Sequence, residues 1–190
     1  MAQMGLKYMA WAPIATETDT AVPTYTANKA ITVGKMISLN VAISNSEGEL
    51  YADDMLAEYA SEFSSAELTA EVDNISLENQ ATILGATYSE EDGFSAAADD
   101  TAPYGGVGGY QVIMVGGSKK YRGWFYPKAK ASMPDLEGST KGSSISFGTQ
   151  SLKLKVTAPK FGGWYYAKEF DTEDAAKTWV DTKLGNTTSK

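Results

Sequence analysis

The sequence contains neither cysteine nor histidine among its 190 residues. Thiolate and imidazole chemistry is therefore missing, and with it every Ser-His or Cys-His nucleophile and the usual ligand sets of zinc, haem and iron–sulfur sites. Disulfide bonds are excluded as well. A chain of this length buries about 70% of its unfolded surface, so we expect residues 1–190 to fold as a single domain held by its core.

Long apolar runs are also missing. No run approaches the ~20 residues that a membrane-spanning helix needs, and the first fifteen residues lack the apolar centre of a signal peptide. We therefore expect a protein without a membrane partner, which stays in the cytoplasm in which it is made.

Basic residues are absent from the middle of the chain. The stretch from Met36 to Ser118 has no lysine or arginine but holds 15 of the 24 acidic residues, while Lys119 to Lys190 carries 13 of the 16 bases. A net charge of −8 argues against gripping nucleic acid, which needs clustered bases. The asymmetry predicts instead that copies of the chain meet acidic face to basic face. The candidate basic interface residues are Lys119, Lys120, Arg122, Lys153 and Lys155.

Alternation of apolar and polar residues predicts a mainly β protein. In the stretch from Phe63 to Asp73, one face carries the apolar residues Ala66, Leu68, Ala70 and Val72. The opposite, solvent-facing side carries Glu67, Thr69, Glu71 and Asp73. Further strands are expected over residues 5–12, 31–43, 109–115, 120–131 and 152–156. Many short strands joined by glycine turns are typical of a sandwich or barrel.

Two segments predict helices. Ser76 can cap a helix that stops at Gly85, and its apolar face comprises Leu77, Ala81 and Leu84. A second helix is expected over residues 172–184, with Glu173 and Asp174 near the positive end of its dipole. Its apolar stripe comprises Ala176, Trp179, Val180 and Leu184.

Three long stretches, residues 15–28, 44–60 and 89–109, are predicted to be loops. Loops longer than ~12–15 residues in a compact domain are usually functional or disordered. We expect the acidic loop 44–60 to be mobile in the monomer and to become ordered on assembly. Its candidate inter-subunit residues are Leu50, Tyr51, Asp53, Asp54 and Glu58.

Adjacent carboxylates are the only classical catalytic groups that remain. They occur at Asp53-Asp54, Glu90-Glu91-Asp92 and Asp99-Asp100, but adjacency does not give the separation across a sugar that glycoside hydrolysis needs, and acidic runs are usually solvated surface. No Asp-x-Asp-x-Asp-Gly calcium loop occurs. The glycine run 105–109 lacks the Lys-Ser/Thr of a phosphate-binding loop, so we expect it to form a turn or to approach another backbone closely. We therefore predict no catalytic residue, no metal site and no cofactor.

Aromatic residues support an alternative function. On a β-sandwich they could form a platform on which sugars stack, as in a carbohydrate-binding, lectin-like module. Aromatic side chains in strands are, however, more often core residues or interface anchors. The residues concerned are Trp11, Tyr121, Trp124, Phe125, Tyr126, Trp164, Tyr165 and Tyr166.

Short motifs follow one another over most of residues 5–157. The first are Gly5-Leu6-Lys7-Tyr8 with Ala10, Leu50-Tyr51-Ala52-Asp53-Asp54 with Ala57-Glu58, Ala66-Glu67-Leu68, and Leu77-Glu78-Asn79-Gln80-Ala81 ending at Leu84-Gly85. They continue with Asp99-Asp100-Thr101-Ala102-Pro103-Tyr104, then Gly108, Tyr110, Tyr121-Arg122, Trp124, Tyr126 and Phe147-Gly148-Thr149. In number and order these motifs resemble the major tail proteins of long-tailed phages, the tail tube family of Gram-positive siphophages. Residues 158–190 match less clearly and are expected to be a C-terminal elaboration.

The resemblance implies a structural virion protein and not an enzyme. Its implied fold is two packed antiparallel sheets with a flanking helix at 76–84. Copies would join their inner sheets into rings, usually of six, which stack into the long flexible tube through which phage DNA is ejected without specific binding. The implied partners are further copies of the chain and the tape-measure, tail-terminator and distal tail proteins, with the virion tail as the final location. An acidic channel would not grip DNA, and the candidate lumen residues are Glu67, Thr69, Glu71 and Asp73.

Overall fold

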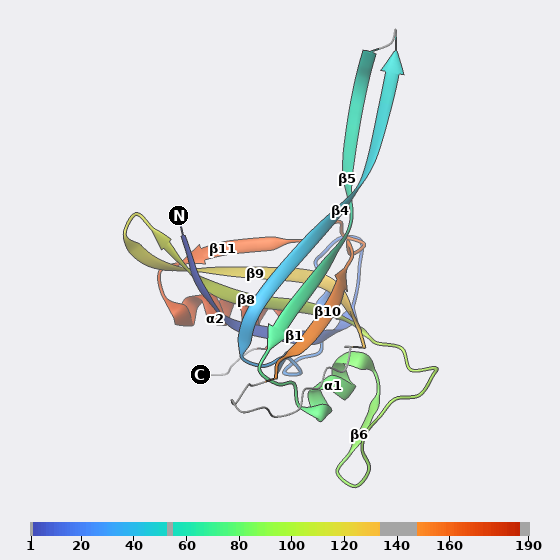
Figure 1. Ribbon diagram of the computed structural model, residues 1–190, viewed down its shortest axis with the longest axis vertical. Coiled ribbons are helices and arrows are strands. Elements are labelled where there is room, and N and C mark those ends of the chain that lie inside the picture. The colour runs from blue at the N-terminus through green and yellow to red at the C-terminus, as the bar shows by residue number, and fades with distance from the viewer. Residues whose placement is uncertain (1, 53–54, 134–147, 187–190) are drawn as a thin grey trace, which may run out of the picture.

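The computed structural model describes residues 2–52, 55–133 and 148–186 (Figure 1). Strands make up more than half of the described residues and helices only a small part of them, so the predicted mainly β fold with two helices is confirmed. The elements are β1 (Ala2–Thr16), β2 (Thr24–Tyr25), β3 (Ile31–Thr32), β4 (Met36–Ala52), β5 (Met55–Val72), α1 (Leu77–Leu84), β6 (Thr87–Ser89), β7 (Gly93–Ser95), β8 (Tyr104–Val115), β9 (Ser118–Ser132), β10 (Gln150–Val156), β11 (Tyr166–Phe170) and α2 (Glu173–Lys183).

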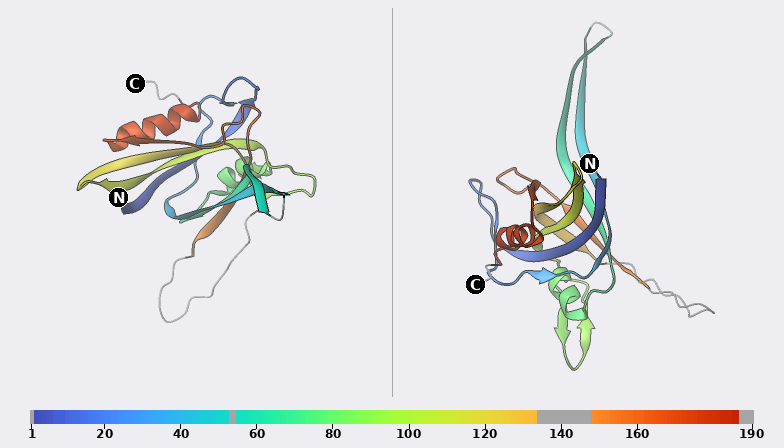
Figure 2. Two further views of the ribbon diagram at one scale, coloured as in Figure 1. Left: turned by 90° about the horizontal axis from the view of Figure 1, so that it is seen from above. Right: turned by 90° about the vertical axis from the view of Figure 1, so that its left-hand side faces the viewer.

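Within the described residues, nine strands form one antiparallel sheet that bends into two layers. The main path runs β2-β1-β8-β9-β10-β5-β4, with β3 beside β1 and β11 beside β9; β6 and β7 form a separate small sheet. The first half of β9 pairs with β11, whereas its last residues, Ala129–Ser132, pair with β10. The long strand β9 thus belongs to both layers, and the β10-β5-β4 layer crosses over the β1-β8-β9 layer (Figure 2).

The main core lies between these two layers. Met9 and Trp11 of β1 and residues of β8 and β9 face the inner sides of β5 and β10. The alternation predicted for β5 is confirmed, because its apolar residues Ala66, Leu68, Ala70 and Val72 are buried. Its polar residues point the other way: Glu67 and Glu71 are exposed, and Thr69 is half-buried.

Glycines inside β8 make room for aromatic rings that pack directly on the strand. A Cβ atom at Gly105 would lie 2.2 Å from Cε2 of Trp11. At Gly109 it would lie 2.2 Å from the carbonyl oxygen of Tyr8 and 2.5 Å from Cζ2 of Trp124. The expectation of a turn at residues 105–109 is therefore wrong, while the expected close approach of another part of the chain is confirmed.

Helix α1 closes one end of the core. It begins after Ser76, whose hydroxyl accepts a hydrogen bond from the Asn79 N–H, and ends at Gly85 with φ 71°. Both boundaries were predicted. The predicted apolar face is wrong at Leu77, which is 50% exposed, because the helix packs through its C-terminal half. The buried residues are Ala81, Ile83 and Leu84.

Helix α2 covers the outer face of the β1-β8-β9 layer (Figure 2). Thr172 caps it by accepting a hydrogen bond from the Ala175 N–H. The predicted stripe is confirmed: Ala176, Val180 and Leu184 are fully buried, and Trp179 packs at their side. Residues 172–184 are therefore an integral layer of the domain.

A buried carboxylate anchors α2 to β1. Asp181 is 4% exposed; its Oδ1 accepts a hydrogen bond of 2.8 Å from the Tyr8 hydroxyl, and its Oδ2 lies 2.6 Å from Lys177 Nζ. Burial and the hydrogen bond to Asp181 raise the pKa of Tyr8. The phenol therefore stays protonated and keeps donating over the physiological pH range.

Replacing Asp181 with alanine is expected to lower the free energy of unfolding by about 1–3 kcal/mol, because the half-buried Tyr8 hydroxyl loses its acceptor. Denaturant unfolding measures this directly. Tyr8→Phe, which removes the donor but leaves the Lys177–Asp181 pair, should be milder, at about 1 kcal/mol. An Asp181→Ala protein with the wild-type midpoint would show that the contact does not hold the helix.

Strands β4 and β5 continue far beyond the body as a two-stranded arm (Figure 1). We define the arm as residues 44–65. Its ladder runs from the pair Ser44–Ser65 to the pair Ala52–Met55. The predicted loop 44–60 is therefore wrong. Because both faces of the arm are solvated, its sequence lacks the one-sided apolar alternation by which a strand is recognised.

Two further boundaries differ from expectation. The strand predicted over residues 31–43 is interrupted at Gly34, whose positive φ of 154° and close approach to the carbonyl of Asn74 separate β3 from β4. The loop predicted over residues 89–109 is shorter, because β7 and the first half of β8 lie within it. Neither described helix is long and apolar enough to cross a membrane.

Candidate functional site

The predicted lumen residues lie on the outer face of the β10-β5-β4 layer. Glu67, Thr69 and Glu71 alternate with the buried residues of β5 and so point away from the core. Glu71 accepts a hydrogen bond of 2.9 Å from the Ser38 hydroxyl. Asp73 follows the strand and accepts hydrogen bonds from the backbone N–H groups of Lys35 and Asn74, each at 2.8 Å. Those bonds lower the pKa of Asp73, so this carboxylate fixes the end of the sheet.

Lysine side chains share this face with the carboxylates. The register places Lys155 opposite Glu67 and Lys153 opposite Thr69; on its other side Lys155 lies opposite Lys130 of β9. Directly opposite residues of antiparallel strands share a face, with Cβ atoms about 4.5–5.5 Å apart. The face therefore carries an acidic column on β5 beside a basic column on β10 and the end of β9, an arrangement that the alternation of one strand did not predict.

Other candidate basic interface residues already contact acidic groups of the same chain. Lys120 Nζ lies 3.1 Å from Asp171 Oδ1, and Arg122 Nη2 lies 2.6 Å from Glu169 Oε1. The ammonium group of Lys119 lies 5.2 Å from the centroid of the Tyr121 ring. Exposed ion pairs of this kind contribute about 0–1 kcal/mol, so a neighbouring subunit can replace them at little cost.

The arm exposes apolar side chains to solvent. Ile43, at its base, Leu50 and Tyr59 are each more than half exposed, and Leu50 lies opposite Glu58 in the ladder. A two-stranded hairpin is marginally stable in water on its own. The register places Leu50 with Glu58 on one face of the ladder and Tyr59 with Glu49 on the other, so each face of the arm offers an apolar side chain to a partner. The side chain of Tyr51 is not among those described, and Asp53 and Asp54 lie outside the described residues.

An aromatic cluster lies at the base of the arm. Phe63 of β5 stacks on Trp164, with ring centroids 3.9 Å apart and planes at 3°. The Tyr126 and Tyr165 rings lie 5.1 Å apart beside this stack. Burial raises the pKa of Tyr126 to about 12. The cluster joins segments that are distant in the sequence, so no local pattern could have predicted it.

Most rings of the hypothetical sugar platform are not accessible. Trp11 and Phe125 are fully buried, and Tyr121, Trp124 and Tyr126 are at most 9% exposed. Tyr165 is 43% exposed; Trp164 and Tyr166 are half-buried. The strand aromatics thus belong mainly to the core.

An open groove lies beside the aromatic cluster, where the two layers of the sheet diverge. Its volume is about 300 Å³. The groove combines apolar walls with planar polar groups, which suits the binding of one aromatic or sugar ring. None of its lining residues is a carboxylate that could act as general acid or base. The lining residues are Leu6, Leu39, Val41, Gln111, Arg122, Trp124, Tyr126 and Tyr165.

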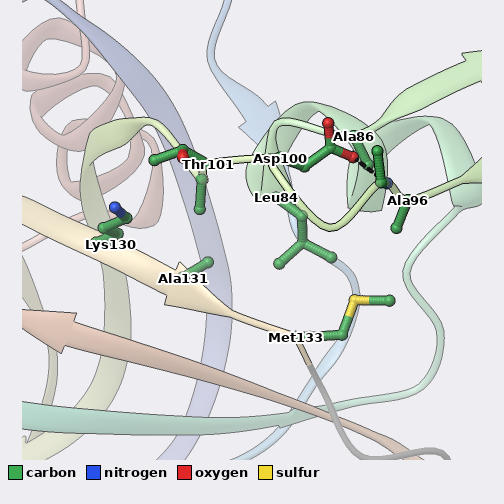
Figure 3. Close-up of a pocket in the computed structure, with 10 residues that line it drawn as sticks. Leu84, Ala86, Ala96, Asp100, Thr101, Lys130, Ala131 and Met133 are labelled. Carbon is green, nitrogen blue, oxygen red and sulfur yellow. Dashed lines mark hydrogen bonds between the residues drawn. The ribbon is translucent and has the colours of Figure 1, made fainter.

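A second hollow, of about 430 Å³, lies between α1 and the end of β9 (Figure 3). Leu84, Ala131 and Met133 point into it. The Asp100 carboxylate on its rim accepts a hydrogen bond of 2.7 Å from the backbone N–H of Ala97, so it serves the loop itself. In the described part of the chain, no three acidic side chains gather closely enough to hold a metal ion.

Comparisons with protein-family models and with curated proteins find no match to this chain. The family suggested by the sequence motifs therefore stays a prediction. The arm, the charged face and the groove are the structural features that bear on function.

Proposed function

We propose that the protein is the major tail tube subunit of a long-tailed phage, a structural protein whose copies assemble into stacked rings around a DNA channel. The proposal rests on one observation, which is that the arm projects from the body and is exposed on both faces. Among the described residues, β4 and β5 run together beyond the body with both faces exposed. Burying Leu50 and Tyr59 therefore requires another molecule, and in a homo-oligomer that molecule is the next copy.

The sheet edge supports the same proposal. Among the residues that the structure describes, β4 ends the main path of the sheet, so this strand of 17 residues pairs with a neighbour on one side only. The strand contains no lysine or proline, residues with which proteins commonly protect such edges. In a closed ring each edge meets the next copy, and no edge stays open.

The β10-β5-β4 face would line the channel. Its exposed Glu67 and Glu71 lie beside Lys153 and Lys155, so we expect DNA to meet a wall of mixed charge that does not hold it. The tape-measure, tail-terminator and distal tail proteins would be the further partners, and the virion tail the final location.

Replacing both Glu67 and Glu71 with lysine tests this orientation. The change joins the acidic and basic columns into one basic face, repeated by every subunit, which would retain DNA through counterion release. We expect tails of normal length and appearance but DNA ejection slowed at least tenfold, measured as dye-detected release from purified particles.

The matched control is Glu67→Gln with Glu71→Gln, which removes the same carboxylates without adding charge and should eject nearly normally. Normal ejection by the lysine variant from normal tails would show that this face points away from the channel.

One observation favours a second candidate function, carbohydrate binding. Tyr165 is partly exposed beside a groove that contains Gln111 and Arg122, and amide and guanidinium groups bind sugar hydroxyls readily. If the protein is a monomer that binds glycans, and if Tyr165→Ala abolishes this binding, carbohydrate binding would be favoured over the tail-tube function.

A further inference from the structure

We propose that the groove between the sheet layers receives the arm of a second copy, with the Tyr59 side chain seated against Tyr126 and Tyr165. This inference rests on the proposed function and names the contact by which one subunit holds the next. The arm and the groove are different surfaces of the same chain. Each copy can therefore donate an arm and accept one, which gives the head-to-tail contact that builds rings or filaments.

The groove suits one aromatic side chain. Its aliphatic walls come from Leu6 of β1 and from Leu39 and Val41 of β4, and the ring of Tyr165 borders it. An aromatic side chain removes about 150–250 Å² from water when it is buried, and tyrosine is enriched in interfaces because its hydroxyl can stay hydrogen-bonded. Gln111 supplies both a donor and an acceptor for that hydroxyl.

The arm presents the matching groups on one face. The register places Glu49 directly opposite Tyr59, so the two side chains project together. Seating Tyr59 in the groove would bring the Glu49 carboxylate toward Arg122. A guanidinium group has five N–H donors, so Arg122 can bind a second carboxylate besides Glu169.

The charges also favour contact of one copy's arm with the body of the second copy over contact between the two arms. Residues 44–62 carry six acidic side chains and no basic one. Two arms laid together would therefore repel each other, whereas the groove offers Arg122 with Lys120 nearby on the same strand. Arm-to-body contact is the pairing that these charges permit.

Cross-linking tests this contact without background, because the chain contains no cysteine. One copy would carry Ser61→Cys, two residues from Tyr59 on the same face of β5, so that the Tyr59 ring stays in place. The other copy would carry Gln111→Cys; Tyr165→Cys is a second acceptor variant, in case the substitution at Gln111 disturbs folding. After mixing and oxidation we expect a linked dimer in the mixture and much less in either variant alone. The control acceptor is Thr69→Cys on the outer face of β5, which should link at least tenfold less.

A matched pair of arm variants adds a kinetic readout. Tyr59→Ala should slow assembly at least tenfold, whereas Tyr59→Phe, which keeps the ring, should slow it by less than threefold. Equal linking of Gln111→Cys and Thr69→Cys, or wild-type assembly by Tyr59→Ala, would overturn the proposed contact.

The outcomes separate this inference from the proposed function. Tubes without the specific cross-link would leave the tail-tube function in place and refute arm docking in the groove. A specific cross-link in oligomers that never form tubes would support the docking and refute the tube. Glycan binding lost on Tyr165→Ala, with no cross-link, would refute the docking and assign the groove to sugars.

Discussion

Gly109→Ala is expected to abolish folding or to lower the free energy of unfolding by about 3–5 kcal/mol. The added methyl group would lie 2.2 Å from the carbonyl oxygen of Tyr8 and 2.5 Å from Cζ2 of Trp124. Neither neighbour can move away, because Tyr8 belongs to the adjacent strand β1 and the Trp124 ring is buried in the core. The sheet would have to separate at the point where three strands meet.

Soluble yield and the midpoint of denaturant unfolding measure this effect. The matched control is Gly48→Ala in the arm, where nothing lies within 4 Å of the added Cβ; its midpoint should stay near that of the wild type. A Gly109→Ala protein that unfolds at the wild-type midpoint would mean that the packing of Trp124 against β8 is wrong.

Removing the arm is expected to abolish assembly while leaving the domain folded. Residues 46–62 would be replaced by Asn-Gly, a two-residue turn that closes an antiparallel hairpin, between Asn45 and Phe63, which lie opposite each other. The described arm side chains in the deleted stretch are exposed, so the core should lose little. Circular dichroism should show the wild-type fold, and sedimentation should show no polymer at concentrations a hundredfold above those at which the wild type assembles.

The shortened chain separates two roles of the hairpin. Tubes of normal diameter formed by this variant would show that the arm is dispensable for assembly and would refute its proposed role in joining subunits, while the tubes themselves would still support the tail-tube function. A variant that fails to fold would instead show that the arm stabilises its own body, contrary to its exposure.

The parts of the fold that were predicted from the sequence are those that a few consecutive residues determine, such as a strand with one buried and one solvated face or a capped helix end. The alternation of β5 was recognised because Leu68 and its apolar neighbours face the core while Glu67 and Glu71 face solvent. The boundaries of α1 and α2 were predicted because Ser76 and Thr172 cap them through their own side chains. Such signals are contained within a few consecutive residues.

The parts that were missed depend on contacts between distant segments. The arm has no buried face, so its strands resemble an acidic loop until β4 is laid against β5. The glycines of β8 were open to several explanations until Trp11 and Trp124 were placed over them. The pairing of β10 with β5 brought Lys155 opposite Glu67, which changed an expected acidic wall into a face of mixed charge.

The candidate site was predicted in part. The residues expected to face a lumen do share an outer face, and the stretch expected to join subunits is the one that projects from the body. Leu77 was expected in the core but is exposed, because helical spacing gives the apolar face of a short helix and not which half of that face meets the core. The groove was not predicted, since its lining comes from four strands and from Tyr165.

Electron microscopy of the concentrated, purified protein tests the central claim most directly. We expect hollow tubes of uniform diameter built from stacked rings, and a reconstruction in which β5 turns Glu67 and Glu71 toward the channel and each arm contacts a neighbouring copy. A monodisperse monomer that forms no tubes at any concentration, and that binds glycans through Tyr165, would contradict it.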